Sequence, residues 1–118
     1  MPAQIIMVHD DHTILDPLGD ALRAGGHDVV AFDQSIAAWD ALSLDCKFDL
    51  LITRVRFPVG PHGLALARRA HMNRKEIQVL FVAAPEMERF TDGLGVLVPM
   101  PTHPSNISET VASMLGVA

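Results

Sequence analysis

Cysteine and most aromatic residues are scarce in this chain. Its 118 residues include one cysteine, Cys46, one tryptophan, Trp39, five phenylalanines and no tyrosine. A single cysteine cannot form an internal disulfide, which argues against the disulfide-rich secreted class. So few aromatic side chains offer little surface on which nucleic-acid bases could stack.

Long apolar runs and excess positive charge are also missing. No apolar run approaches the roughly 20 residues of a membrane-spanning helix. Residues 1–8 lack the basic start and the small-residue cleavage site of a signal peptide. With 9 basic and 14 acidic residues the net charge is −5, so the chain has no general attraction to nucleic acid or anionic membranes. We expect a cytoplasmic protein.

The length and composition fit one domain. Hydrophobic residues make up 49% of the chain and charged residues 19%. A chain of this size buries roughly two-thirds of the surface that its unfolded form exposes, so it can build an ordinary core without a metal or disulfide. We expect a single domain over residues 1–118, without an output domain of its own.

Short apolar runs alternate with segments of helical periodicity. The run at residues 4–8 is continuous rather than alternating, with Ile5–Val8 apolar, which is typical of a strand buried on both faces. Further strands are predicted at 27–32, 48–53, 77–83 and 96–98, helices at 13–24, 35–44, 64–72 and 105–115, and at most two helical turns at 85–92. The spacing of Thr13 to Asp16 and of Asn106 to Glu109 predicts Thr13, and Ser105 or Asn106, as helix N-caps.

This alternation predicts an α/β fold with a doubly wound, five-stranded parallel sheet and helices on both faces. In such folds, functional residues gather at the carboxyl ends of the strands. Asp10 and Asp11 follow the first strand there. Two adjacent carboxylates repel each other, and a divalent cation or a guanidinium group stabilises such a pair. A solvated loop is the alternative interpretation.

Three segments together resemble the receiver domain of two-component response regulators, over nearly all of the chain. They are IIMVHDD at 5–11, GHDVV at 26–30 and FDLLIT at 48–53. Pro58 and Gly63 match the family's Met-Pro-x-Met-Asp-Gly loop, and Pro101 matches the proline that follows its lysine. The resemblance implies the flavodoxin-like strand order 2-1-3-4-5 and a cis peptide before Pro101.

The family's activity is a phosphorylation switch. Its acid pair and a third aspartate, at the end of strand three, hold Mg²⁺, and that aspartate accepts a phosphoryl group from a histidine kinase. A hydroxyl residue, a lysine and an aromatic residue complete the switch. The resemblance places Arg54 at the acceptor position, and it places the hydroxyl, aromatic and lysine positions at Ala83, Leu97 and Met100. Thr53 cannot replace the acceptor, because neighbouring residues on a strand face opposite sides. We therefore expect a pseudo-receiver without enzymatic activity.

The charges indicate how the acid pair is stabilised. Asp10, Asp11 and Arg54 sum to −1, whereas the family's three aspartates and one lysine leave −2 for a divalent cation. We expect the Arg54 guanidinium to occupy the place of the ion and to lock one conformation. The alternatives are that Arg54 extends into solvent and that Asp10 and Asp11 bind Mg²⁺.

Two segments differ in length from the family pattern. The loop at 57–63 is one residue longer, and the segment between Ala83 and Met100 is about five residues shorter by comparison with the family. The fourth helix must therefore be short or absent. Because that helix belongs to a face through which many receivers dock, their partner geometry cannot simply be carried over.

Four histidines suggest another function. His9, His12, His62 and His103 fall at the same predicted edge as the acid pair. Together they could hold Zn²⁺ or another transition metal, which would make the protein a metal- or ligand-binding α/β domain. Their spacing matches no known metal signature, and separate loop histidines are the simpler interpretation.

Positive charge is concentrated in one segment. Between Leu50 and Lys75 there are six basic residues and no acidic one: Arg54, Arg56, Arg68, Arg69, Arg74 and Lys75. We expect Arg68, Arg69 and Arg74 on the exposed side of the third helix. The segment is a solvated face, a surface for an acidic partner or a second copy, or a nucleic-acid site. As a partner we expect a histidine kinase, another regulator or a second copy of the chain.

Overall fold

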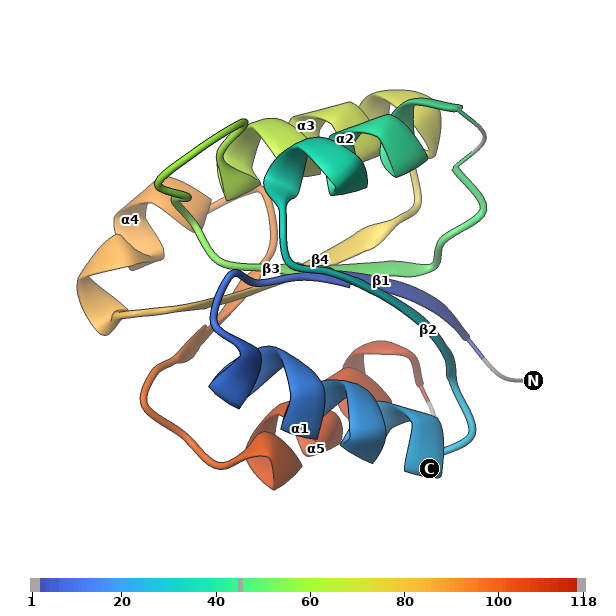
Figure 1. Ribbon diagram of the computed structural model, residues 1–118, viewed down its shortest axis with the longest axis vertical. Coiled ribbons are helices and arrows are strands. Elements are labelled where there is room, and N and C mark those ends of the chain that lie inside the picture. The colour runs from blue at the N-terminus through green and yellow to red at the C-terminus, as the bar shows by residue number, and fades with distance from the viewer. Residues whose placement is uncertain (1–2, 45, 117–118) are drawn as a thin grey trace.

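A five-stranded parallel sheet forms the middle layer of the protein. The computed structural model describes residues 3–44 and 46–116. Its strands are β1 (Gln4–Val8), β2 (Asp28–Phe32), β3 (Leu50–Thr53), β4 (Gln78–Ala83) and β5 (Val96–Pro99). They lie in the order β2-β1-β3-β4-β5 (Figure 1), which confirms the predicted fold class and strand order.

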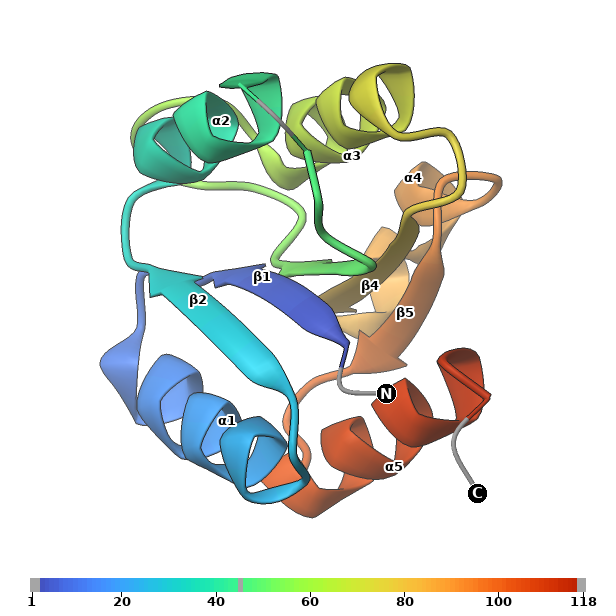
Figure 2. The same cartoon turned by 90° about the vertical axis from the view of Figure 1, so that its right-hand side faces the viewer.

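Helices cover both faces of the sheet (Figure 2). The helices α1 (His12–Ala24) and α5 (Pro104–Met114) lie on one face, and α2 (Ser35–Leu44) and α3 (Gly63–Asn73) lie on the other. The fourth helical segment consists of a 3₁₀ turn at Pro85–Met87 and the four-residue α4 (Glu88–Thr91), so the predicted shortening is confirmed. In the part of the chain that the structure describes, no helix is long and apolar enough to cross a membrane.

The continuous apolar run of β1 is explained by two separate cores. Ile6 and Val8 pack with α2 and α3, whereas Ile5 and Met7 pack with α1 and α5. Because side chains alternate along a strand, every residue of such a run must be apolar when both faces are covered. The same arrangement buries all four residues of β3.

The strand register aligns the carboxyl ends of the central strands. Val8 lies opposite Phe32 and Thr53, and Thr53 lies opposite Phe81. On the far side of the sheet, Ala83 lies opposite Pro99. The segments that follow β1, β3, β4 and β5 therefore meet at one edge.

The predicted helix caps were wrong by two or three residues. The N-cap of α1 is Asp11, whose carboxylate accepts from the backbone N–H of Thr13. The N-cap of α5 is His103, which accepts from the N–H of Ser105, and Pro104 opens the helix. In both helices a residue at least two positions before the predicted cap supplies an acceptor for a free N–H group, and proline is well suited to the first helical position.

The basic segment is not one exposed patch. Arg68 is exposed, but Arg69 donates to the hydroxyl of Ser43 at 2.8 Å and stacks on the ring of Trp39. Arg74 lies just beyond α3, where it pairs with Asp49 at 3.0 Å. The guanidinium of Arg74 also donates to the carbonyls of residues 47 and 48. The expectation of three exposed arginines was therefore wrong for Arg69 and Arg74, because both stabilise neighbouring chain segments.

Candidate functional site

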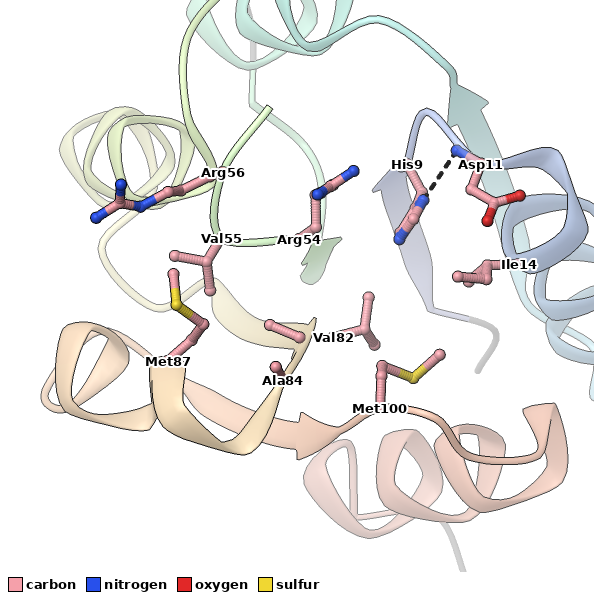
Figure 3. A pocket seen from close by; sticks show the side chains of 11 residues that line it. His9, Asp11, Ile14, Arg54, Val55, Arg56, Val82, Ala84, Met87 and Met100 are labelled. Atoms are coloured by element: carbon pink, nitrogen blue, oxygen red, sulfur yellow. Dashed lines mark hydrogen bonds between the residues drawn. The ribbon is translucent and has the colours of Figure 1, made fainter. Parts of the chain in front are cut away.

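A cavity of about 450 Å³ lies at the carboxyl edge of the sheet (Figure 3). Arg54, Ala83 and Met100, from the ends of three strands, line it together with His9 and Asp11. Leu97, the fourth position taken from the resemblance, instead packs half-buried against the core on the α2 and α3 side. The peptide bond between Met100 and Pro101 is cis, as expected.

Arg54 lies against Asp10, one member of the acid pair, and its side chain is only partly exposed to solvent. Its Nη1 donates to Oδ1 of Asp10 at 2.6 Å, a short charge-assisted hydrogen bond. Burial acts to raise the pKa of Asp10, but the hydrogen bond and positive charge of Arg54 outweigh it and lower that pKa. Both side chains remain about one-third exposed, so the pair contributes no more than about 1 kcal/mol to stability.

Asp11 is turned toward α1. Its Oδ1 accepts from the hydroxyl of Thr13 at 2.6 Å and from the backbone N–H of Thr13 at 2.9 Å. These two hydrogen bonds lower the pKa of Asp11. The two neighbouring carboxylates therefore have different partners, a guanidinium for Asp10 and a helix N-terminus for Asp11.

The side chain of His9 faces the cavity. It is buried, and burial together with the charge of Arg54 lowers its pKa against the opposing effects of Asp10 and Asp11. Its Nδ1 accepts from the backbone N–H of Asp11 at 3.0 Å, so the proton of the neutral ring lies on Nε2. The ring points into the cavity (Figure 3).

The other histidines at this edge are engaged separately. Nδ1 of His62 accepts from the N–H of Phe57, and His103 caps α5. The ring of His12 lies between the carboxylates of Asp16 and Asp33. Across the described residues no group of three or more His, Cys, Asp or Glu side chains is placed to hold a metal. The structure therefore does not assemble the histidine metal site considered above.

Comparison with known proteins shows what the chain as a whole resembles. The chain is 33% identical to the response regulator protein FleR of Pseudomonas aeruginosa over 84 residues, 71% of this chain and 17% of that protein. It is 28% identical over 109 residues to the Arabidopsis thaliana protein named as two-component response regulator ARR21, which covers 89% of this chain and 18% of that protein. The matches thus span less than a fifth of either relative. No protein-family model matches the chain.

Solved structures agree over nearly the whole chain. A response regulator receiver protein from Sinorhizobium medicae superposes with a TM-score of 0.87 at 19% identity, covering 98% of this chain and 95% of that one. The chain is a receiver-fold domain. The receiver of the hybrid histidine kinase CckA superposes with a TM-score of 0.79 at 23% identity and covers 95% of this chain and 98% of that one.

The residues of this receiver do not fit the Mg²⁺ ion that the receiver fold implies. Mg²⁺ prefers octahedral oxygen ligands, typically one or two carboxylates completed by water. Here a guanidinium nitrogen lies 2.6 Å from Asp10, and Asp11 caps α1. Arg54 therefore brings positive charge and hydrogen-bond donors to the position where the ion would need an oxygen ligand.

His12 links α1 to the end of β2 in this receiver. Its Nδ1 lies 3.1 Å from Asp16 and its Nε2 lies 3.0 Å from Asp33. Both ring nitrogens face carboxylate oxygens, so both hydrogen bonds form only when the ring is protonated. The hydrogen bonds with Asp33 and Asp16 accordingly raise the pKa of His12 above 6.5.

We expect His12→Gln to remove a stabilisation that exists at acidic pH. Since the folded pKa of His12 is raised, its contribution is complete below pH 6.5 and is lost as pH rises through the folded value. Thermal unfolding of the wild type and of His12→Gln, from below pH 6.5 to above it, measures the effect. His9 is present in both proteins, so its contribution cancels in the difference between their unfolding temperatures. A difference in unfolding temperature that does not change with pH would contradict this role.

These histidine roles were not predicted from the sequence. His12 and Asp33 are 21 positions apart, and no motif joins them. His9 follows an apolar strand directly, and that position was the available signal that it would be buried. The helix that begins after Asp11 then places the backbone N–H of Asp11 against His9.

Proposed function

We propose that this domain is a pseudo-receiver of two-component signalling, which acts in the cytoplasm by binding another signalling protein and not by phosphoryl transfer. The observation that carries the proposal is the 2.6 Å hydrogen bond from Arg54 to Asp10. It puts a permanently charged guanidinium at the end of β3, where the resemblance implies a phosphoryl-accepting carboxylate.

The rest of the cavity supports the same conclusion. Transfer to an aspartate needs a nucleophile and groups that stabilise negative charge on the transferred phosphoryl oxygens. The Ala83 and Met100 side chains line the cavity at the hydroxyl and lysine positions, and neither can donate a hydrogen bond. The nearest hydroxyl along β3, Thr53, is fully buried and donates to the carbonyl of Arg54 at 2.9 Å.

The candidate partners follow from the relatives. FleR and ARR21 are named as response regulators, and CckA as a hybrid histidine kinase. A histidine kinase, another regulator or a second copy of this chain would each recognise the domain by its surface. The Arg54–Asp10 contact would hold the edge of the sheet in one arrangement, so that the protein acts as a fixed binding module.

Incubation with acetyl phosphate and Mg²⁺, followed by intact-mass measurement, tests the proposal. We expect the mass to remain unchanged, while a receiver with the complete acid triad gains one phosphoryl group under the same conditions. A gain of one phosphoryl group on an aspartate of this chain would overturn the proposal.

A further inference from the structure

A second hollow lies beside the acid pair, on the α2 and α3 side of the sheet. It has a volume of about 550 Å³ and is lined by Asp10, Asp33–Ile36 and Phe57–Gly60. We call it the α2 groove. Its rim carries two of the most exposed large apolar side chains of the described residues, Val59 at 82% and Ile36 at 50%. In Figure 1 the loop after β3 runs beside the first turn of α2.

The α2 groove is held in shape by contacts within the chain. The buried hydroxyl of Ser35 donates to the carbonyl of Val59 at 3.1 Å. Gly60 adopts a φ of +87°, and a Cβ there would lie 2.6 Å from that hydroxyl, so the loop can approach α2 this closely only with glycine. The N–H of Phe57 donates to His62 at 3.0 Å. These contacts hold the loop against α2 while the Val59 side chain faces solvent.

Acidic groups border the α2 groove. The carboxylates of Asp10 and Asp33 are part of its lining, and Asp40 lies one helical turn beyond Ile36 on the same side of α2. Arg54 pairs with Asp10, so Asp33 and Asp40 supply the negative charge of the border. Residues 1–49, which include these acids, have 2 basic and 9 acidic residues, a net charge of 2 − 9 = −7. A ligand with an apolar side chain and neighbouring cationic groups would therefore match both the apolar lining and the acidic border of the groove.

We propose that the α2 groove is the docking site for a segment of a partner protein that carries large apolar side chains flanked by Lys or Arg. The inference rests on the proposed function, because it names the surface through which the pseudo-receiver acts. Burial of the apolar side chains supplies most of the affinity, and the acidic border selects the charge of the partner.

Two capped tetrapeptides probe the groove by amide NMR. One has the sequence Arg-Leu-Leu-Arg and the other has the sequence Glu-Leu-Leu-Glu. We expect the cationic peptide to shift the amide signals of residues 33–36 and 57–60 with millimolar affinity, and the acidic peptide to bind at least about tenfold more weakly at low salt. The difference should shrink as the salt concentration rises, because salt screens exposed charges.

Matched variants distinguish binding in the α2 groove from nonspecific binding to exposed apolar side chains. Val59→Ser and Ile36→Ser remove exposed apolar groups, so both variants should fold normally, and each should weaken binding of the cationic peptide about fivefold to tenfold. Leu44→Ser is the control, because Leu44 is 87% exposed on the same helix and lies eight residues, about 12 Å, further along it. This control should bind the peptide as the wild type does.

Several outcomes would overturn the docking proposal. They are equal binding of the two peptides, no shift of the groove signals, or the same loss of binding in Leu44→Ser. A concentration-dependent shift of these signals without peptide, together with a dimer in sedimentation, would assign the groove to a second copy. A phosphoryl gain from acetyl phosphate would contradict the proposed function but not the docking site, since the peptide titration needs no phosphorylation.

Discussion

Replacing Gly63 by alanine is expected to lower the free energy of unfolding by about 3 kcal/mol or more. An alanine Cβ at this position would lie 1.8 Å from the carbonyl oxygen of Arg54 and 3.1 Å from the hydroxyl of Thr53. The N–H of Gly63 donates to Val55 at 2.9 Å, so the start of α3 is fixed against the end of β3. The backbone must move to admit the methyl group. Urea unfolding of the variant measures the loss.

Gly26→Ala is the control for the loss of glycine itself. Gly26 has a φ of +90° and no atom within 4 Å of the Cβ position. Alanine there should therefore lower the free energy of unfolding by only about 1–2 kcal/mol, the cost of a left-handed backbone at a residue with a Cβ. A loss for Gly63→Ala no larger than that of Gly26→Ala would contradict the close approach of α3 to Arg54.

Arg54→Asp is expected to convert the site into one that binds Mg²⁺. The change removes the guanidinium from Asp10 and adds a third carboxylate beside the acid pair, so repulsion among the acids destabilises the variant without cation. Bound Mg²⁺ offsets that repulsion. At a free concentration tenfold above the dissociation constant, it should raise the free energy of unfolding by about 1.4 kcal/mol. Thermal unfolding over a Mg²⁺ series, with Ca²⁺ and high NaCl for comparison, measures the gain.

Arg56→Asp makes the same change of charge two residues away. Arg56 stacks on the ring of Phe90, with 5.5 Å between the guanidinium carbon and the ring centroid. Its replacement by aspartate therefore tests whether the change of charge in this region is enough to create a Mg²⁺ site. We expect no Mg²⁺-specific stabilisation in this variant. If both variants gained equally from Mg²⁺, or if Arg54→Asp gained nothing, the guanidinium would not stand where the cation would bind.

The fold was predictable from the sequence because burial on two faces leaves a clear pattern. The run Ile5–Val8 must be apolar throughout, since alternate residues enter two different cores. The predicted helix at 35–44 has the bounds observed for α2, and the predicted strand at 77–83 begins one residue before β4. The caps were missed because Asp11 and His103 act through local hydrogen bonds to Thr13 and Ser105, which no periodicity reports.

The site was predictable only in part. The resemblance to receivers placed Arg54, Ala83 and Met100 at one edge, and the structure brings these three to one cavity. The other contacts depend on distances between loops that sequence patterns do not contain. The pairing of His12 with Asp33 and the hydrogen bond from Ser35 to Val59 both join segments more than 20 residues apart. Arg74 likewise pairs with Asp49, which lies in the chain before β3.

Titration of the unmodified protein with Mg²⁺, followed by the amide signals of Asp10 and Asp11, tests the role of Arg54 most directly. Because the guanidinium of Arg54 holds Asp10 at 2.6 Å, we predict no saturable change of these signals at millimolar Mg²⁺. Saturable binding of Mg²⁺ at millimolar or lower concentration, at these two residues, would contradict a guanidinium that takes the place of the ion.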